Sequence, residues 1–270
     1  MESPDELAGA RRPLPDLPLS APPAAVAVRN LRKLYGSKAA VDGLDLVVPC
    51  GCFFGFLGPN GAGKTTTIRM LMGLIPPTSG EISILGLSMP ADDVAIKKRI
   101  GLVPDETLLF DQLTGMEFLE FVGRMYGLEK SSSRERAREL MALFELDSRQ
   151  RKLIGEYSKG MRKRVAMAAA LIHRPQLFLM DEPFEGVDAV GARLMKDILL
   201  EQVRQGATIF LTSHVLEVVE RLCDRVAIIH DGRLVVDDSI GNLRAGEETL
   251  EDIFVRVVGG GRTREPIEWL

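Results

Sequence analysis

The sequence is poor in the residues that build disulfide frameworks and transition-metal clusters. Its 270 residues include only three cysteines and three histidines. Three cysteines are too few for a disulfide framework. We expect Cys50 and Cys52 to share one face of a strand, and Cys223 lies far along the chain. This arrangement gives little support for a metal site. We therefore expect reduced, partly buried thiols in a protein of the cytosol.

The chain also lacks a strong charge of one sign. Its net charge is −4 and its pI is about 5.6, so no overall basic field favours nucleic acid as a main partner. The chain has one compact basic cluster, which we expect to be a solvated helix face. The cluster comprises Lys159, Arg162, Lys163 and Arg164.

No segment has the composition of a membrane-spanning helix or a signal peptide. The longest uncharged run, residues 46–63, is too rich in glycine and proline to span a membrane as a helix. The acidic start lacks the charged and apolar regions of a signal peptide. The sequence therefore predicts a cytoplasmic chain with no membrane span of its own.

Composition divides the chain into one folded domain between two tails. Hydrophobic residues make up 46% and charged residues 27%, which supports a packed core and excludes a disordered or fibrous chain. Residues 1–24 are predicted to be a disordered, Pro-rich tail, and residues 25–245 the folded domain. Residues 246–270 are predicted to form a short helix, at 249–258, and a tail.

Hydrophobic periodicity within the domain changes from strand-like to helical and back. Strands are predicted from Ala25 and at 44–48, 53–57, 81–85, 177–180, 208–211, 225–229 and 234–236. Helices are predicted at 114–126, 133–145, 158–173, 189–204 and 215–222. We expect breaks at Gly127, at serines 131–133 and at Gly155, and a hairpin turn at Asp231-Gly232. This order predicts an α/β core that carries an inserted helical block.

A phosphate-binding loop follows an apolar strand and precedes a helix. Residues 58–65 match the pattern G-x-x-x-x-G-K-[ST], in which glycines let backbone N–H groups point at a phosphate beside a helix N-terminus. Lys64 is expected to reach the β- and γ-phosphates, and the Thr65 hydroxyl to complete a Mg²⁺ shell. A dinucleotide-binding motif is excluded, because no third glycine follows Gly63. The expected nucleotide-binding residues here are Gly58, Pro59, Asn60, Gly61, Ala62, Gly63, Lys64, Thr65 and Thr66.

An acidic pair, Asp181-Glu182, stands at the end of the predicted strand 177–180. In a doubly wound sheet this is the edge that holds the ligand. Asp181 could bind the metal, and Glu182 could orient or deprotonate a water that attacks the γ-phosphate. Taken alone, such a pair after a strand is more often structural. Together with the phosphate loop it predicts hydrolysis of a nucleoside triphosphate.

Five spaced elements resemble the ATP-binding cassette (ABC) ATPases over nearly the whole of residues 25–236. They are Tyr35 before the loop, the loop itself, the segment beginning at Ser158, the acidic pair followed by Asp188, and His214 after the next strand. The resemblance implies a P-loop NTPase core with an N-terminal antiparallel β subdomain, residues 25–104 and 174–245, and an inserted α-helical subdomain, residues 105–173.

The resemblance also implies roles for single residues. Tyr35 would stack on adenine, whereas an exposed turn tyrosine is the alternative. Ser158 and the Gly160 N–H would touch the γ-phosphate bound by an opposite subunit, and Asp188 would lie in the loop that crosses the dimer axis. His214 would contact the γ-phosphate and hold the Glu182–water geometry. If the resemblance is set aside, Ser158 and Asp188 are predicted to be helix N-caps, and His214 is predicted to have a structural role.

Two departures from the family pattern are visible. The usual Leu-Ser-Gly-Gly-Gln is replaced by residues 157–161, Tyr-Ser-Lys-Gly-Met, which is similar to the branch that pairs with type-2 exporter permeases. Asp105 stands where most relatives have Gln, a residue that contacts the metal and relays the nucleotide state to the permease. A carboxylate there can bind Mg²⁺ more directly. The hypothesis is retained hydrolysis with altered coupling.

The resemblance therefore implies an ATP-binding and hydrolysing subunit of an export transporter. It would work as a head-to-tail nucleotide-sandwich dimer, with an identical or a different second ATPase subunit. It would drive a separate membrane permease on the inner face of the cell membrane, docking through residues 105–173. Two alternatives stay open: a soluble cassette ATPase acting on nucleic acid or ribosomes, and a regulatory module that binds ATP without hydrolysing it.

Overall fold

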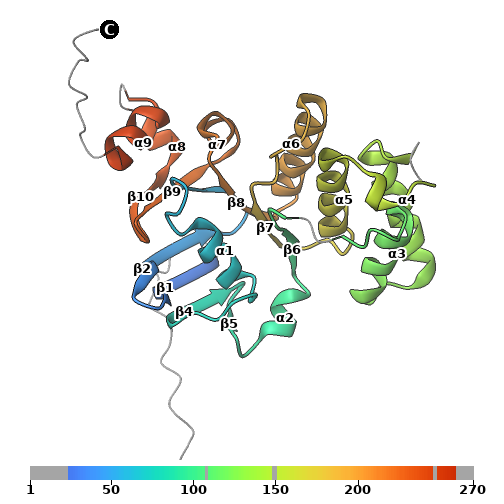
Figure 1. The fold of residues 1–270 in the computed structure, drawn as a ribbon, viewed down its shortest axis with the longest axis horizontal. Helices are drawn as coiled ribbons and strands as arrows, with labels where there is room; N and C mark the ends of the chain where they lie inside the picture. The colour runs from blue at the N-terminus through green and yellow to red at the C-terminus, as the bar shows by residue number, and fades with distance from the viewer. Residues whose placement is uncertain (1–23, 107–108, 148–150, 246–247, 260–270) are drawn as a thin grey trace, which may run out of the picture.

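Two β-sheets and a block of helices make up the computed structural model (Figure 1), which describes residues 24–106, 109–147, 151–245 and 248–259. The predicted Pro-rich tail, apart from Ala24, and the end of the predicted C-terminal tail lie outside the described residues. Among the described residues, no helix is both long enough and apolar enough to cross a membrane.

The smaller sheet is antiparallel, with the strand order β2-β1-β4-β5. Its strands are β1 (Ala24–Tyr35), β2 (Lys38–Pro49), β4 (Ser79–Ile84) and β5 (Leu87–Met89). Alternating apolar residues such as Val26 and Val28 are buried, and they pack in one core with Phe54 and Phe56 of the larger sheet. The larger sheet is therefore covered on one side by the smaller one.

The larger sheet has the order β10-β9-β3-β8-β7-β6, and all neighbouring strands except β10 and β9 are parallel. Its strands are β3 (Phe53–Leu57), β6 (Ile100–Val103), β7 (Leu177–Asp181), β8 (Thr208–Ser213), β9 (Arg225–His230) and β10 (Arg233–Ser239). Every residue of β3, β7 and β8 is buried, as expected for parallel strands covered on both faces. Their carboxyl ends therefore share one edge.

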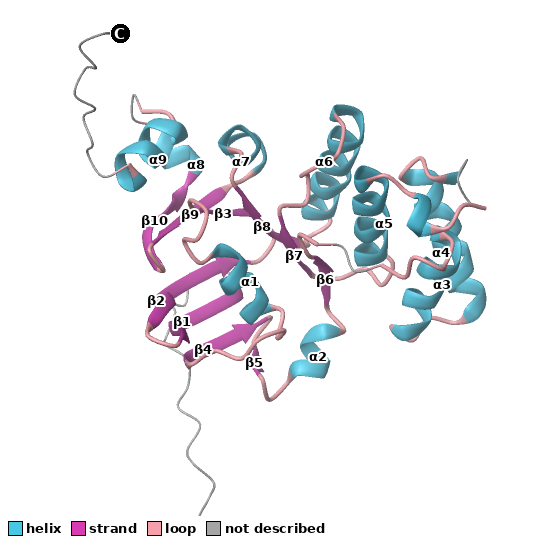
Figure 2. Ribbon diagram, viewed as in Figure 1, coloured by secondary structure: helices cyan, strands magenta, loops and turns pink. Residues whose placement is uncertain are grey.

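Helices flank this sheet and form a separate block beside β6 (Figure 2). The block contains α3 (Gly115–Met125), α4 (Lys130–Leu143), the short 3₁₀ helix η2 (Ile154–Glu156) and α5 (Lys159–Leu171). The other helices are α1 (Lys64–Leu71), α2 (Asp93–Lys97), α6 (Ala189–Arg204), α7 (Leu216–Leu222), α8 (Ile240–Arg244) and α9 (Leu250–Val258). The predicted helical insertion thus corresponds to α3–α5, while the exact subdomain boundaries stay predictions.

Three local expectations are wrong. Cys50 and Cys52 do not lie on a strand but in the turn between β2 and β3, where Gly51 has a φ of +71°. Serines 131–133 do not break the helix but lie inside α4, because the buried Ser133 hydroxyl donates to the Glu120 carbonyl 2.7 Å away on α3. The basic cluster is not a uniformly solvated face, because Lys163 is 1% exposed.

All three cysteines are free, and burial raises the pKa of Cys52 to about 11.

Strand β6 is an element that the periodicity did not predict. It is short and contains Gly101, which lowers strand propensity. A Cβ at Gly101 would lie 2.7 Å from the Ala170 carbonyl oxygen of α5, so the glycine permits this helix to pack closely on the strand.

The predicted hairpin at Asp231-Gly232 is confirmed, with positive φ at both residues, as a type I′ turn requires.

Candidate functional site

The predicted phosphate loop connects β3 to α1, at the carboxyl edge of the larger sheet. Two of its glycines are required by close approach of the backbone. A Cβ at Gly58 would collide with the Ile229 carbonyl oxygen, and a Cβ at Gly63, where φ is +112°, with the Ala40 carbonyl oxygen. The loop is thus fixed between β9 and β2, and its tight course depends on glycine.

The loop has the features of an anion site. No side chain caps α1, and its first turn holds no acidic residue, so the helix N-terminus keeps its positive partial charge. A Cβ at Gly61 would meet nothing within 4 Å, so this part of the loop borders open space. Thr65 is exposed and Thr66 half-buried at the start of the helix. A triphosphate therefore fits the exposed side of the loop.

Lys64 lies across its own loop. Its Nζ donates to the carbonyl oxygens of Gly58 at 2.6 Å and Pro59 at 3.2 Å. Burial lowers the pKa of Lys64, while the charges of Glu182 and Asp181 act in the opposite direction. Two carbonyl oxygens of the loop thus hold the ammonium at the loop itself, where its charge favours an anion.

The acidic pair ends β7 and is anchored by a threonine on β8. The Thr212 hydroxyl donates to the buried Asp181 carboxylate and accepts from the Glu182 N–H at 3.2 Å. Glu182 has a φ of +45°, an uncommon conformation for a residue other than glycine. Thr212 was not predicted, because an interior strand threonine gives no functional signal by itself.

His214 follows β8 and lies against Glu182. Its Nδ1 is 3.0 Å from Glu182 Oε1, and the histidine is about half exposed whereas the glutamate is mostly buried. The pairing of Leu57 with Ser213 and of Asp181 with Thr212 brings the ends of β3, β7 and β8 together. The structure thus unites the phosphate loop, the acidic pair and His214 at one edge.

Tyr35 stands at the end of the β1–β2 hairpin. It is 55% exposed, and the Lys33 ammonium lies 5.4 Å from the centroid of its ring. The same hairpin approaches the phosphate loop, because Ala40 of β2 contacts Gly63 as described above. An exposed aromatic ring on this hairpin is available for stacking.

Ser158, Gly160 and Asp188 form a second cluster. Ser158 caps α5 by accepting from the Met161 N–H at 3.3 Å, and Asp188 caps α6 by accepting from the Gly191 N–H at 2.9 Å. A Cβ at Gly160 would lie 3.2 Å from the Gly186 carbonyl oxygen, so this helix end packs on the loop before α6. In the view of Figure 1, β6 and β7 lie between α1 and α5. In that view these strands therefore separate α5, which begins at this cluster, from the helix that follows the phosphate loop.

Asp105 follows β6 and pairs with a lysine that the sequence analysis placed on a solvated helix face. Its Oδ1 is 3.6 Å from the Nζ of Lys163, and its side chain is 47% exposed. Lys163 was missed because its partners lie far from it in the sequence and its neighbours in the basic cluster are more exposed.

Within the described residues, no three His, Cys, Asp or Glu side chains are grouped to hold a metal ion. Mg²⁺ does not require such a group, because it keeps several waters and takes one or two protein ligands beside substrate phosphates. The Thr65 hydroxyl and the Asp181 carboxylate have the oxygen chemistry that Mg²⁺ prefers, so the residues present fit this ion.

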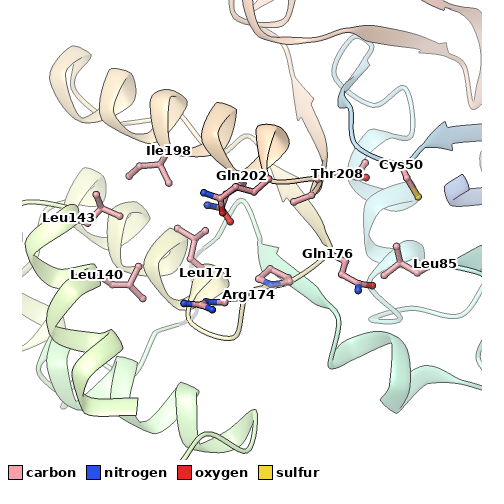
Figure 3. Close-up of a pocket in the computed structure, with 14 residues that line it drawn as sticks. Cys50, Leu85, Leu140, Leu143, Leu171, Arg174, Gln176, Ile198, Gln202 and Thr208 are labelled. Atoms are coloured by element: carbon pink, nitrogen blue, oxygen red, sulfur yellow. The ribbon is translucent and has the colours of Figure 1, made fainter. Parts of the chain in front are cut away.

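Figure 3 shows residues that line an open cavity of about 740 Å³. Gln176 and Thr208, at the amino-terminal ends of β7 and β8, line it together with Leu140 and Ile198 of the flanking helices. The predicted site residues lie at the carboxyl ends of these strands. The cavity is therefore distinct from the phosphate loop.

Comparison with known proteins agrees with these motifs. A sequence profile of the ABC transporter family matches residues 41–185. The chain belongs to the ABC transporter family. The Nod factor export ATP-binding protein I of Cupriavidus metallidurans is 41% identical over 79% of this chain and 71% of its own length. The linearmycin resistance ATP-binding protein LnrL of Bacillus subtilis is 40% identical over 84% of this chain and 73% of its own length.

A solved ABC cassette, MJ0796, in a dimeric post-hydrolysis state bound to ADP and Pi, has a TM-score of 0.74. It is 26% identical over 80% of this chain and 98% of that one. The prediction of an ABC ATPase of the exporter branch, and with it the fold class, is confirmed. These relatives give no support to a cassette acting on nucleic acid or to a non-hydrolysing module.

Proposed function

We propose that this ABC ATPase binds ATP between two subunits, hydrolyses it with Glu182 as the base, and drives a separate export permease. The strongest support is the meeting of the phosphate loop, the acidic pair and His214 at one sheet edge, with 3.0 Å between His214 Nδ1 and Glu182 Oε1. Three segments far apart in the sequence converge there, as phosphoryl transfer requires.

In this proposal the phosphate loop and Lys64 bind the β- and γ-phosphates, and Tyr35 stacks on the adenine. Thr65, Asp181 and Asp105 are the proposed Mg²⁺ ligands. The bound ion would neutralise charge that develops on the phosphate oxygens. Phosphoryl transfer needs little from the protein beyond positioning and charge stabilisation, and these residues supply both.

Glu182 is the proposed general base. Its carboxylate would accept a proton from water as the water oxygen bonds to the γ-phosphorus and the bond to the bridging oxygen breaks, which releases ADP. His214 Nδ1 lies 3.0 Å from Glu182 Oε1, so its N–H would hold the carboxylate by donating to it. Thr212 fixes the backbone of the same residue. Each residue orients the base without taking part in bond breaking.

The second cluster supports a head-to-tail dimer. Ser158 and Asp188 are exposed, and α5, which Ser158 caps, lies across β6 and β7 from α1 in the view of Figure 1. We propose that Ser158 and the Gly160 N–H reach the γ-phosphate bound by a second ATPase subunit, and that Asp188 lies near the dimer axis. The site would then be complete only when two subunits meet around ATP.

A membrane permease is the proposed second partner, on the inner face of the membrane. The helical block carries exposed apolar side chains, which are Phe110 at 51%, Phe121 at 43% and Met125 at 71% exposure. Phe110 packs against Phe118 and Phe121, with ring centroids 5.9 and 5.5 Å apart. Exposed aromatic clusters of this kind mark protein contacts, so we propose this surface for docking.

The decisive test is the variant Glu182→Gln, which keeps the shape of the side chain and removes the base. We expect turnover to fall by about 10²-fold or more, while ATP converts the monomer to a dimer in size-exclusion chromatography. The control is the wild-type chain with ADP, which should stay monomeric. Hydrolysis at the wild-type rate by Glu182→Gln would overturn the assignment of the base.

A further inference from the structure

Lys163 is a buried cation that contacts two loops of the proposed site. It lies on α5, one turn after the helix begins at Lys159, and its side chain is 1% exposed. Burial lowers the pKa of Lys163, while the charge of Asp105 opposes that shift. A lysine is rarely buried to this extent unless it is paired and hydrogen-bonded.

The partners of Lys163 come from the two loops that carry the proposed catalytic groups. Its Nζ donates to the Pro104 carbonyl oxygen at 3.3 Å and to the Glu182 carbonyl oxygen at 3.2 Å. It also lies 3.6 Å from Asp105 Oδ1. One ammonium group thus joins α5, the loop after β6 and the loop after β7.

Glu182 is one of the residues that this contact restrains. Its φ of +45° is uncommon for a side chain other than glycine, so surrounding contacts must hold it. Thr212 fixes its N–H and His214 its carboxylate, and Lys163 fixes its carbonyl oxygen. The three contacts restrain the peptide unit and the carboxylate together.

We propose that Lys163 is a positioning residue for ATP hydrolysis, which holds Glu182 in its reactive orientation and couples it to the loop of Asp105. This inference rests on the proposed function, because Lys163 is given no chemistry of its own and acts only through Glu182 as the proposed base. It also gives a reason for an acid at position 105, since the buried ammonium needs a counter-charge.

The pair is asymmetric. Asp105 is 47% exposed and can be hydrated if Lys163 is removed, whereas Lys163 is 1% exposed and cannot be hydrated if Asp105 loses its charge. Removing the lysine therefore releases Glu182, and removing the acid leaves the lysine free to seek another carboxylate. Both changes act through one contact network, so their effects on turnover should not add.

The test compares Lys163→Met with Arg136→Met in the full chain. Arg136 makes a similar bond from a basic side chain to a backbone carbonyl, Nη1 to Ile172 O at 2.8 Å, which joins α4 to the end of α5. We expect Lys163→Met to lower kcat by about tenfold or more, with the affinity for a fluorescent ATP analogue changed less than about twofold. Arg136→Met should lower Tm with kcat unchanged, and Lys163→Arg should recover part of kcat.

A second comparison starts from Asp105→Asn, a single variant that leaves Lys163 in place. Asp105→Asn alters a half-exposed side chain and is expected to lower kcat about two- to fivefold. In the Lys163→Met background the same change should have a smaller effect than in the wild-type chain, and the effect that remains measures Asp105 as a proposed Mg²⁺ ligand. Full additivity of the two changes, or equal loss of kcat in Lys163→Met and Arg136→Met, would overturn the inference. A wild-type chain that hydrolyses no ATP would instead overturn the proposed function.

Discussion

The carboxyl edge of the larger sheet and the beginning of α5 both carry residues of the proposed ATP site, yet they differ in how completely one chain builds them. At the sheet edge, Glu182 has partners for its N–H, its carbonyl oxygen and its carboxylate within the same chain. At the starts of α5 and α6, Ser158 and Asp188 satisfy only their own helix ends. The first region is preorganised for chemistry within one chain. The second region is exposed, as expected for a surface that binds a second subunit.

The largest effect is expected at the sheet edge, from Lys64→Met. Loss of the cation from the phosphate loop should reduce kcat/KM by about 10³-fold, because one preorganised charge stabilises the transferred phosphoryl group. ATPase kinetics and binding of a fluorescent ATP analogue measure this loss. Lys97→Met is the control, since that lysine pairs with Asp93 on α2 and should behave as wild type. Equal activity of the two variants would contradict the assignment of the loop.

His214→Ala is expected to have the next largest effect. Without the contact to Glu182 Oε1 the base loses its orientation, and kcat should fall by about 10²-fold. ATP binding should be retained, because the phosphate loop is untouched. Single-turnover hydrolysis separates the two steps. A variant that loses affinity but keeps kcat would show that His214 serves binding alone.

The beginning of α5 can be tested without loss of its helix cap. Asp and Asn cap helices about as well as Ser, so Ser158→Asp and Ser158→Asn should keep the wild-type Tm. Only the aspartate would bring negative charge to the γ-phosphate of the facing subunit. We therefore expect Ser158→Asp to weaken ATP-dependent dimer formation by about tenfold relative to Ser158→Asn. Analytical ultracentrifugation measures this, and equal dimerisation of the two variants would contradict the proposed contact.

The smallest effect is expected from Asp105→Gln, which installs the residue of most relatives. Because Asp105 is half-exposed, its ion pair contributes at most about 1 kcal/mol. Basal turnover should change by less than about fivefold, equivalent to ~1 kcal/mol. The ratio of permease-stimulated to basal turnover, measured in proteoliposomes, should change as well. Unchanged basal and stimulated rates would end the hypothesis of altered coupling.

Local motifs were the most predictable part of the molecule. The phosphate loop, the turn at Asp231-Gly232 and the helix 189–204 were predicted where the structure has them, because each depends on contiguous residues. Strand β6 was not predicted, since its short run and Gly101 become a strand only beside β7 and under α5. Serines 131–133 were misread for the same reason, because the Ser133 hydroxyl finds its acceptor on another helix.

The sequence by itself determined the family, the α/β class and the set of residues proposed to bind ATP. Those features are written in short motifs and in their order along the chain. The tertiary structure alone decided which side chains are in contact. His214 lies against Glu182, and Thr212 is hydrogen-bonded to both residues of the acidic pair. Lys163 is buried and donates to backbone carbonyl oxygens. The reason is that burial and hydrogen-bond partners depend on how distant segments pack together. In the sequence, a lysine of a basic cluster that faces the core cannot be distinguished from one that faces water.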